Sequence, residues 1–270
     1  MYEIWFACTE EKMYRCRFMA GYLRMTDEVP ADTLPAPEHA VVITGDPETL
    51  QRFGKKGYCC IGFDPSGETF FEGAEYVITE LKSVSEDLIV RAYDHHFRRP
   101  HTIAETERLL IRESTEEDYP AVSALIRENG DAAIWFFTQG NTISKEEYLS
   151  YIGMTYRFFE FGNWSVCEKS TGEVIGWCGL NPVRVSDPGM AVLRYHSEGS
   201  PEGEEPSPDE DTELGYVIRR DRRGRGCAHE ACAAILRYAE RELGITQYCV
   251  HIRAGNESSF RLARKLGFTG

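Results

Sequence analysis

The sequence lacks the features that would place the protein in a membrane or on nucleic acid. No apolar run approaches the roughly 20 residues of a membrane-spanning helix. No basic segment precedes Glu10 and Glu11, so we expect a cytoplasmic protein without a secretory signal. Positive charge is scarce, because 30 Lys and Arg stand against 44 Asp and Glu, for a net charge of -14. This balance argues against nucleic acid or an anionic membrane as a partner.

Patterns of metal ligands are also missing. The nine cysteines include the adjacent Cys59 and Cys60, but none forms a Cys-x-x-Cys pair or a Cys/His cluster with zinc spacing. We therefore expect no metal and reduced, mostly buried thiols. Cys227 differs because it lies in a glycine-rich turn at a helix start, where we expect it to contribute its backbone N–H.

What is present suits a two-domain α/β protein. A chain of 270 residues with 42% hydrophobic residues can bury two cores. The stretch 98–101 reads as a linker, which predicts domains at residues 1–100 and 101–270.

The first domain alternates strands and helices. Expected elements are strands at 40–44, 58–63 and 76–78 and helices at 48–55 and 86–97. Ser85 is a candidate cap of the second helix. These elements predict a small βαβ-type unit with a parallel sheet. Upstream, residues 11–25 have the pattern of an amphipathic helix, and residues 27–37 hold three prolines, typical of a connector.

Residues 42–47, Val-Ile-Thr-Gly-Asp-Pro, and 73–78, Gly-Ala-Glu-Tyr-Val-Ile, resemble the last part of a haloacid-dehalogenase-like domain. That family needs an Asp-x-Asp nucleophile pair on its first strand, and none precedes Gly45 here. The resemblance therefore implies a degenerate domain without catalysis. Asp46 is either a metal ligand or the cap of the following helix, and its place before Pro47 favours the cap. His95 and His96 are expected at the surface, because adjacent helical residues cannot easily share a metal.

The second domain contains a basic turn between a strand and a helix. The strand 214–218 precedes Arg219, Arg220 and Arg222 and the segment 223–228, Arg-Gly-Arg-Gly-Cys-Ala, and a helix follows over 228–243. Unpaired N–H groups at a helix start bind anions, and glycine lets the backbone approach a phosphate. The turn therefore predicts an anion site, with the three arginines before residue 223 as flanking charge.

This segment fits the Arg/Gln-x-x-Gly-x-Gly/Ala signature of the GNAT superfamily of N-acetyltransferases. A second segment, residues 256–268, resembles the family's Asn-x-x-Ser-x-x-x-x-x-Lys-Leu-Gly-Phe signature, and residues 105–111, Glu-Thr-Glu-Arg-Leu-Leu-Ile, resemble the opening strand of its ribosomal-protein (Rim-like) branch. The resemblance covers residues 105–268. It implies a mixed, mostly antiparallel sheet flanked by helices, with a final strand expected beyond residue 268. Without that strand we expect an open sheet edge, or one that the first domain or a second chain covers.

The family implies acetyl-CoA as co-substrate and a primary amine as acceptor, either a protein N-terminus or a small amine, in a monomer or homodimer. The same motifs also suit a non-catalytic acyl-CoA sensor, with the first domain as interaction module. The residues expected to bind acetyl-CoA are Tyr216, Val217, Ile218, Arg223, Gly224, Arg225, Gly226, Cys227, Ala228, Asn256 and Ser259.

The catalytic groups are less defined by the sequence. Glu213 opens the strand before the turn and is a candidate base, or else a strand-end charge. His251 is a weaker candidate base. Ser259 or a water is the candidate acid, because many acetyltransferases have a tyrosine near this position and this sequence has Phe260 next to Ser259. The aromatic stretches 135–137 and 156–161 line either the acceptor site or the core, and the acidic loop 197–210 is either a solvated insertion or a lip that attracts a cationic amine.

Overall fold

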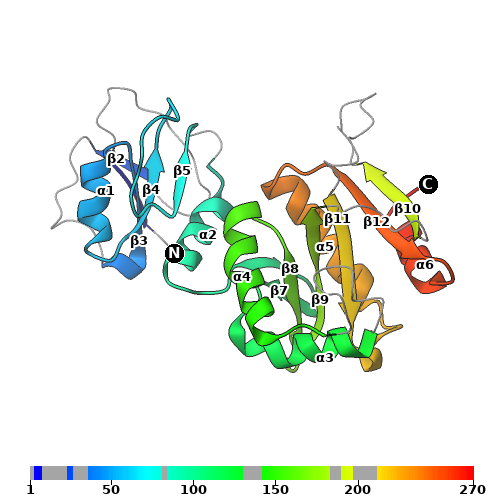
Figure 1. Ribbon diagram of the computed structural model, residues 1–270. Coiled ribbons are helices and arrows are strands. Elements are labelled where there is room, and N and C mark those ends of the chain that lie inside the picture. Colours follow the sequence, from blue (N-terminus) through cyan, green and yellow to red (C-terminus); the bar gives the residue numbers. More distant parts are fainter. Residues whose placement is uncertain are drawn as a thin grey trace. The chain divides into compact units, whose positions relative to one another are not determined.

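The computed structural model describes residues 3–7, 23–26, 36–80, 84–129, 142–182, 190–196 and 212–270. The chain divides into two compact units, Met1–His101 and Thr102–Gly270, whose elements are drawn in Figure 1. In the described residues, no helix is long and apolar enough to cross a bilayer.

The first unit is a parallel sheet of five strands in the order β2-β1-β3-β4-β5, which confirms the predicted parallel sheet. Its elements are β1 (Glu3–Ala7), β2 (Leu23–Thr26), β3 (Ala40–Thr44), α1 (Pro47–Gly54), β4 (Cys59–Phe63), β5 (Tyr76–Ile78) and α2 (Glu86–His96), with a short 3-10 turn at Pro37–His39. Val41 and Ile43 pack with residues of α2, and Val42 packs with residues of α1. The central strand is therefore buried on both faces, as its apolar run predicts.

Side-chain caps begin both helices of this unit. The N–H of Thr49 donates to Asp46 Oδ2 at 3.0 Å, and that hydrogen bond lowers the pKa of Asp46. The N–H of Leu88 donates to Ser85 Oγ at 3.1 Å. Of the two readings of Asp46, the structure shows the helix cap.

Two predictions for this unit are wrong. The helix expected over 11–25 does not include residues 23–25, which belong to strand β2 and pair with β1. Pairing with a neighbouring strand overrides local periodicity there. Residues 8–22 lie outside the described residues. His95 is buried rather than exposed. Its ring stacks on Tyr76 at a centroid separation of 6.3 Å.

The second unit contains a sheet of seven strands in the order β10-β12-β11-β9-β8-β7-β6. All neighbours are antiparallel except β11 and β12, which confirms the mixed, mostly antiparallel fold. The strands are β6 (Thr102–Glu105), β7 (Leu109–Arg112), β8 (Asn163–Glu168), β9 (Val174–Pro182), β10 (Met190–His196), β11 (Thr212–Ile218) and β12 (Gln247–Arg253). The helices are α3 (Tyr119–Asn129), α4 (Lys145–Phe159), α5 (Cys227–Glu242) and α6 (Glu257–Lys265).

Helices cover both faces of this sheet. The buried face of α5, with Ala231, Ile235 and Ala239, packs with Trp164 of β8 and other strand residues. Val122 of α3 packs with Trp177 of β9 in a separate cluster. The apolar residues of both helices recur at helical spacing, which suits packing on one face.

The edge of β12 is covered from within the chain. β10 pairs with β12 over seven residues, and Thr269 forms an antiparallel bridge with Arg194 of β10. β10 therefore lies beside β12 and is the last strand of the described sheet. An internal strand that the sequence pattern does not reveal occupies this position.

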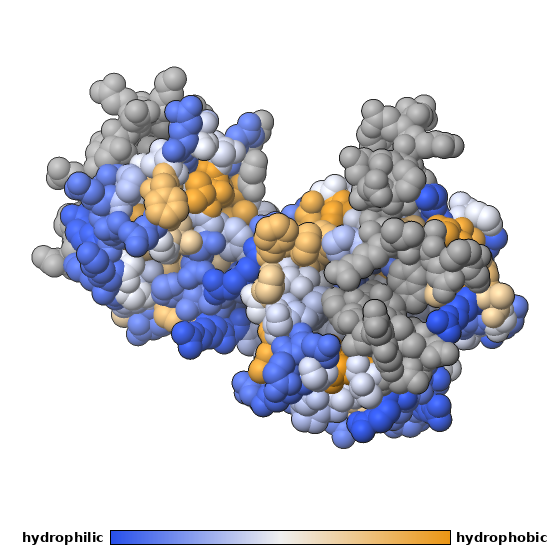
Figure 2. Space-filling model, in the orientation of Figure 1, coloured by the Kyte–Doolittle hydropathy of each residue, from blue (hydrophilic) through white to orange (hydrophobic). Residues whose placement is uncertain are grey.

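Both units are mostly hydrophilic on the face that Figure 2 shows, with scattered apolar patches. The exposed large apolar side chains of the described residues are Phe70, Val77, Met154, Phe158 and Phe159. The seven described cysteines are free and buried, which confirms the prediction of buried thiols for this part of the chain.

Candidate functional site

The site begins where two parallel strands separate. β11 and β12 are each seven residues long, but they pair only through Thr212–Tyr248 and Glu213–Cys249. On its other side, β11 pairs with β9 along its full length. Within the described residues, the edge of β11 beyond Glu213 therefore has no strand partner, and its polar backbone groups are left for another ligand.

Two adjoining pockets lie at this separation. The smaller, of about 100 Å³, is lined by β11, β12 and α6. The larger, of about 470 Å³, is lined by β11, the basic turn, the first turn of α5, the end of α3 and α6. Both are lined by Tyr216, Asn256, Ser259 and Leu262. A molecule bound at the turn can therefore extend toward the strands.

The basic turn shapes one wall of the larger pocket. Gly224 and Gly226 adopt φ values of +72° and +83°, which side chains other than glycine rarely tolerate. α5 starts at Cys227 with Gly226 as N-cap, and no described side chain caps its first N–H groups. An uncapped helix start attracts an anion, so this wall has the chemistry of an anion site.

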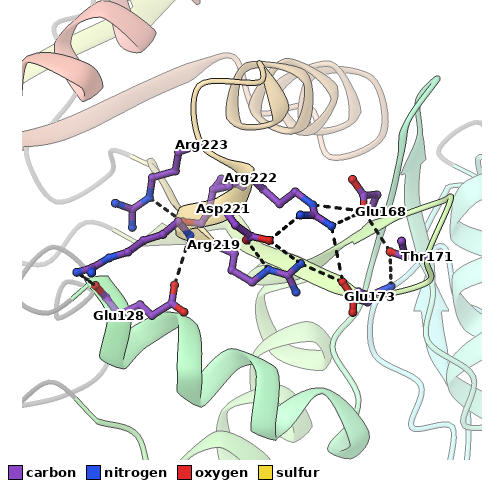
Figure 3. Close-up of polar contacts among 10 residues, drawn as sticks. Glu128, Glu168, Thr171, Glu173, Arg219, Asp221, Arg222 and Arg223 are labelled. Carbon is purple, nitrogen blue, oxygen red and sulfur yellow. Dashed lines mark hydrogen bonds and ion pairs between the residues drawn. The ribbon is translucent and has the colours of Figure 1, made fainter.

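The arginines of the turn are mostly held by the protein itself, as Figure 3 shows. Arg219 binds Glu173 at 2.9 Å and Asp221 at 2.7 Å. Arg222 binds Glu168 at 3.1 Å. The Arg220 guanidinium donates to the Glu128 carbonyl at 3.1 Å. These three side chains therefore join the turn to its neighbours.

Arg223 is held in a similar way. Its Nε donates to the Ile218 carbonyl at 3.0 Å, and its Nη2 donates to Asn129 Oδ1 at 2.6 Å. Arg223 thus ties the turn to the end of α3. Arg225 is exposed and does not line either pocket.

Arg108 and Glu230 support the turn from behind. Arg108 Nη1 donates to the Arg225 carbonyl at 2.8 Å, and its Nε donates to Glu230 Oε2 at 2.7 Å. Thr106 Oγ1 donates to Glu230 Oε1 at 2.5 Å. Burial would raise the pKa of Glu230, but the hydrogen bonds from Thr106 and Arg108 lower it. We call Thr106, Arg108 and Glu230 the clamp behind the turn. Sequence reasoning missed it, although Thr106 and Arg108 belong to the motif at 105–111.

The two candidate bases meet in the smaller pocket. Glu213 Oε1 on β11 lies 3.2 Å from His251 Nδ1 on β12, and the side chains are 6% and 3% exposed. Burial raises the pKa of Glu213, although His251 partly opposes this. A carboxylate whose pKa is raised in this way is a stronger base. Sequence reasoning named both residues separately but did not predict their contact.

Ser259 has an unexpected partner. The Tyr216 hydroxyl, on β11, donates to Ser259 Oγ at 2.9 Å, and burial raises the pKa of Tyr216. Tyr216 was expected to bind acetyl-CoA, but its contact with Ser259 was not predicted. The structure therefore provides a tyrosine hydroxyl in the pocket, although Phe260 follows Ser259.

Asn256 caps α6. Its Oδ1 accepts hydrogen bonds from the Ser259 N–H at 3.2 Å and from Ser258 Oγ at 2.9 Å. Its Nδ2 has no partner in the described residues and remains a donor on the wall shared by both pockets.

The remaining predicted residues are distributed as follows. The larger pocket is also lined by Val217, Ile218, Arg223, Gly224, Gly226, Cys227 and Ala228. Tyr156 is buried and donates its hydroxyl to the Asn163 carbonyl, so it belongs to the core rather than to an acceptor site. Residues 135–137 and 197–210 lie outside the described residues. In the described part of the chain, no three His, Cys, Asp or Glu side chains gather as metal ligands.

The sequence of the second unit matches a known protein family. The sequence profile described as "Acetyltransferase (GNAT) domain" matches residues 108–269. The uncharacterized N-acetyltransferase YoaA of Bacillus subtilis (strain 168) is 25% identical over 169 residues, 62% of this chain and 82% of YoaA. The uncharacterized protein YkkB of the same organism is 24% identical over 162 residues, 60% of this chain and 82% of YkkB. The crystal structure of the acetyltransferase from Agrobacterium tumefaciens str. C58 is 22% identical, with a TM-score of 0.43, over 61% of this chain and 81% of that one.

Proposed function

The chain belongs to the acetyltransferase (GNAT) domain family, and from this we propose that its second unit is an N-acetyltransferase acting on a primary amine. Members of this family use acetyl-CoA as co-substrate. The observation that carries the proposal is the Glu213–His251 contact in a pocket that adjoins an uncapped helix start. The acceptor is a protein N-terminus or a small amine.

The residues present fit acetyl-CoA. The N–H groups at the start of α5 and the left-handed Gly224 and Gly226 suit the diphosphate. The unpaired edge of β11 after Glu213 and the Asn256 amide suit the amide-bearing pantetheine arm. When bound, acetyl-CoA supplies an acetyl group activated as a thioester.

Each remaining step of acetyl transfer has a candidate residue. Glu213, beside His251, accepts the proton that the ammonium group must lose before it can attack. Backbone N–H groups on the open edge of β11, within residues 216–218, stabilise the oxyanion. The Tyr216–Ser259 hydroxyl pair donates the proton that the departing thiolate takes up.

The test is release of coenzyme A in the presence of acetyl-CoA and a panel of amines that includes N-terminal peptides and small polyamines. We expect release that depends on both substrates. Tight acetyl-CoA binding without release on any amine would instead identify a non-catalytic sensor.

We expect the Tyr216→Phe and Ser259→Ala variants to lower kcat about tenfold while the Kd for acetyl-CoA changes less than twofold, because the hydroxyls act only when the thiolate leaves. Stopped-flow turnover and calorimetry measure the two quantities. Equal losses of turnover and affinity would count against a role as acid.

A second prediction concerns the clamp behind the turn. We expect Arg108→Glu to weaken acetyl-CoA binding about tenfold, because the Arg225 carbonyl loses its donor and Glu230 gains a repulsive neighbour. The double variant Arg108→Glu, Glu230→Arg should recover part of this loss, as measured by calorimetry. If the double variant binds no better than the single one, the ion pair does not position the turn.

Two finer assignments belong to the same proposal. We assign the second unit to the Rim-like branch on the motif at 105–111, which favours N-terminal peptides in the acceptor screen.

We also assign residues 1–100 to a degenerate dehalogenase-like domain without catalysis. The all-parallel sheet and the use of Asp46 as a helix cap support this. Phosphatase activity of the full chain that is lost in Asp46→Asn would contradict it.

A further inference from the structure

The larger pocket contains two basic side chains that the basic turn does not supply. His229 of α5 and Arg261 of α6 both line it. Within the described residues, neither side chain has a hydrogen bond or an ion pair, in contrast to Arg219, Arg222 and Arg223 of the turn. In the described part of the chain, His229 and Arg261 therefore keep their side-chain donors free for a ligand.

The electrostatic surroundings of this wall are positive. Burial together with the charges of Lys265 and Arg237 lowers the pKa of His229. The acid in the lining, Glu128, lies on α3, and its carboxylate accepts a hydrogen bond from the Arg220 N–H at 3.4 Å. His229 is therefore mostly neutral near pH 7 and offers a hydrogen bond, while Arg261 supplies a positive charge. Together the two side chains favour a bound anion.

Coenzyme A carries two separate anionic groups, a diphosphate and a phosphate monoester on its ribose. The uncapped start of α5 offers backbone N–H groups to only one of them. Backbone donors need close approach, which Gly224 and Gly226 permit, whereas a monoester dianion is best matched by charged side chains. We propose that His229 and Arg261 bind the ribose phosphate monoester and so make the protein select coenzyme A over dephospho-coenzyme A. This inference rests on the proposed function.

The test compares two ligands that differ only in the monoester. Calorimetry measures the Kd of coenzyme A and of dephospho-coenzyme A for the full chain and for the variants Arg261→Gln and His229→Gln. We expect the full chain to bind coenzyme A about tenfold more tightly. Each variant should reduce this ratio several-fold, with the Kd of dephospho-coenzyme A unchanged.

Arg264→Gln is the matched control. It removes the same charge from the same helix, but Arg264 contacts the Gly270 carbonyl at 2.9 Å and does not line either pocket. We expect Arg264→Gln to keep the same ratio of the two Kd values as the unaltered chain. Equal affinity of the full chain for both ligands, or variants that weaken both ligands equally, would overturn the inference while leaving the proposed function intact. A full chain that binds neither ligand would contradict both.

Discussion

We expect the Gly226→Trp variant to bind acetyl-CoA at least about 100-fold more weakly than the wild type. Gly226 has φ +83°, and a Cβ there would lie 3.4 Å from Arg108 Nη2. A side chain at this position is strained by roughly 1–3 kcal/mol, and an indole would also fill the space in front of the α5 N–H groups. Both effects act on the wall that we assign to the diphosphate.

Gly244→Trp is the control for strain alone. Gly244 also has a left-handed φ, +67°, and nothing lies within 4 Å of its Cβ position. It follows α5 at the end of the helix opposite the pocket. We expect this variant to lose similar stability in thermal unfolding but to keep its affinity by calorimetry. Unchanged affinity of Gly226→Trp would contradict the assignment of the turn.

We expect Glu213→Gln to lower kcat about 100-fold with little change in acetyl-CoA affinity. The amide keeps the shape of the side chain but cannot accept the proton of the amine, and general-base catalysis contributes about 10²–10⁴-fold. Burial raises the pKa of Glu213, so its basic, ionised form is lost as the pH falls through that raised pKa. In the wild type, kcat should therefore rise with pH on the acidic side and then level off, and the variant should lose this rise.

The pH profile of kcat at saturating amine measures this effect. Glu113→Gln serves as control, because Glu113 is also a buried carboxyl of the second unit, 7% exposed, and lines neither pocket. We expect Glu113→Gln to keep the rise of kcat with pH on the acidic side of the profile. If Glu213→Gln still shows the same rise of kcat with pH, another group, such as His251, is the base.

Local signals in the sequence predicted most of the regular structure. The caps at Ser85 and Asp46 follow from residue type and spacing within a few positions. The turn at Gly226 was equally visible, because it depends on one short segment. The parallel sheet of the first unit followed from the apolar run at 40–44.

What the sequence did not reveal depends on contacts between distant segments. Glu213 and His251 were both named, but their meeting depends on the register of β11 against β12. The strand β10 was missed, because its assignment follows from pairing with β12 rather than from its own pattern. The burial of His95, on helix α2, likewise depends on Tyr76 of strand β5.

The clamp behind the turn also has a consequence for the order of folding. Arg108 and Glu230 are 122 positions apart, and closing such a long stretch of chain costs entropy before any contact repays it. The turn therefore gains the contacts from Arg108 only after the segment of β6 and β7 has packed against α5. Coenzyme A affinity then reports on completion of the whole second unit, and a nascent chain that has not reached α5 has no such affinity.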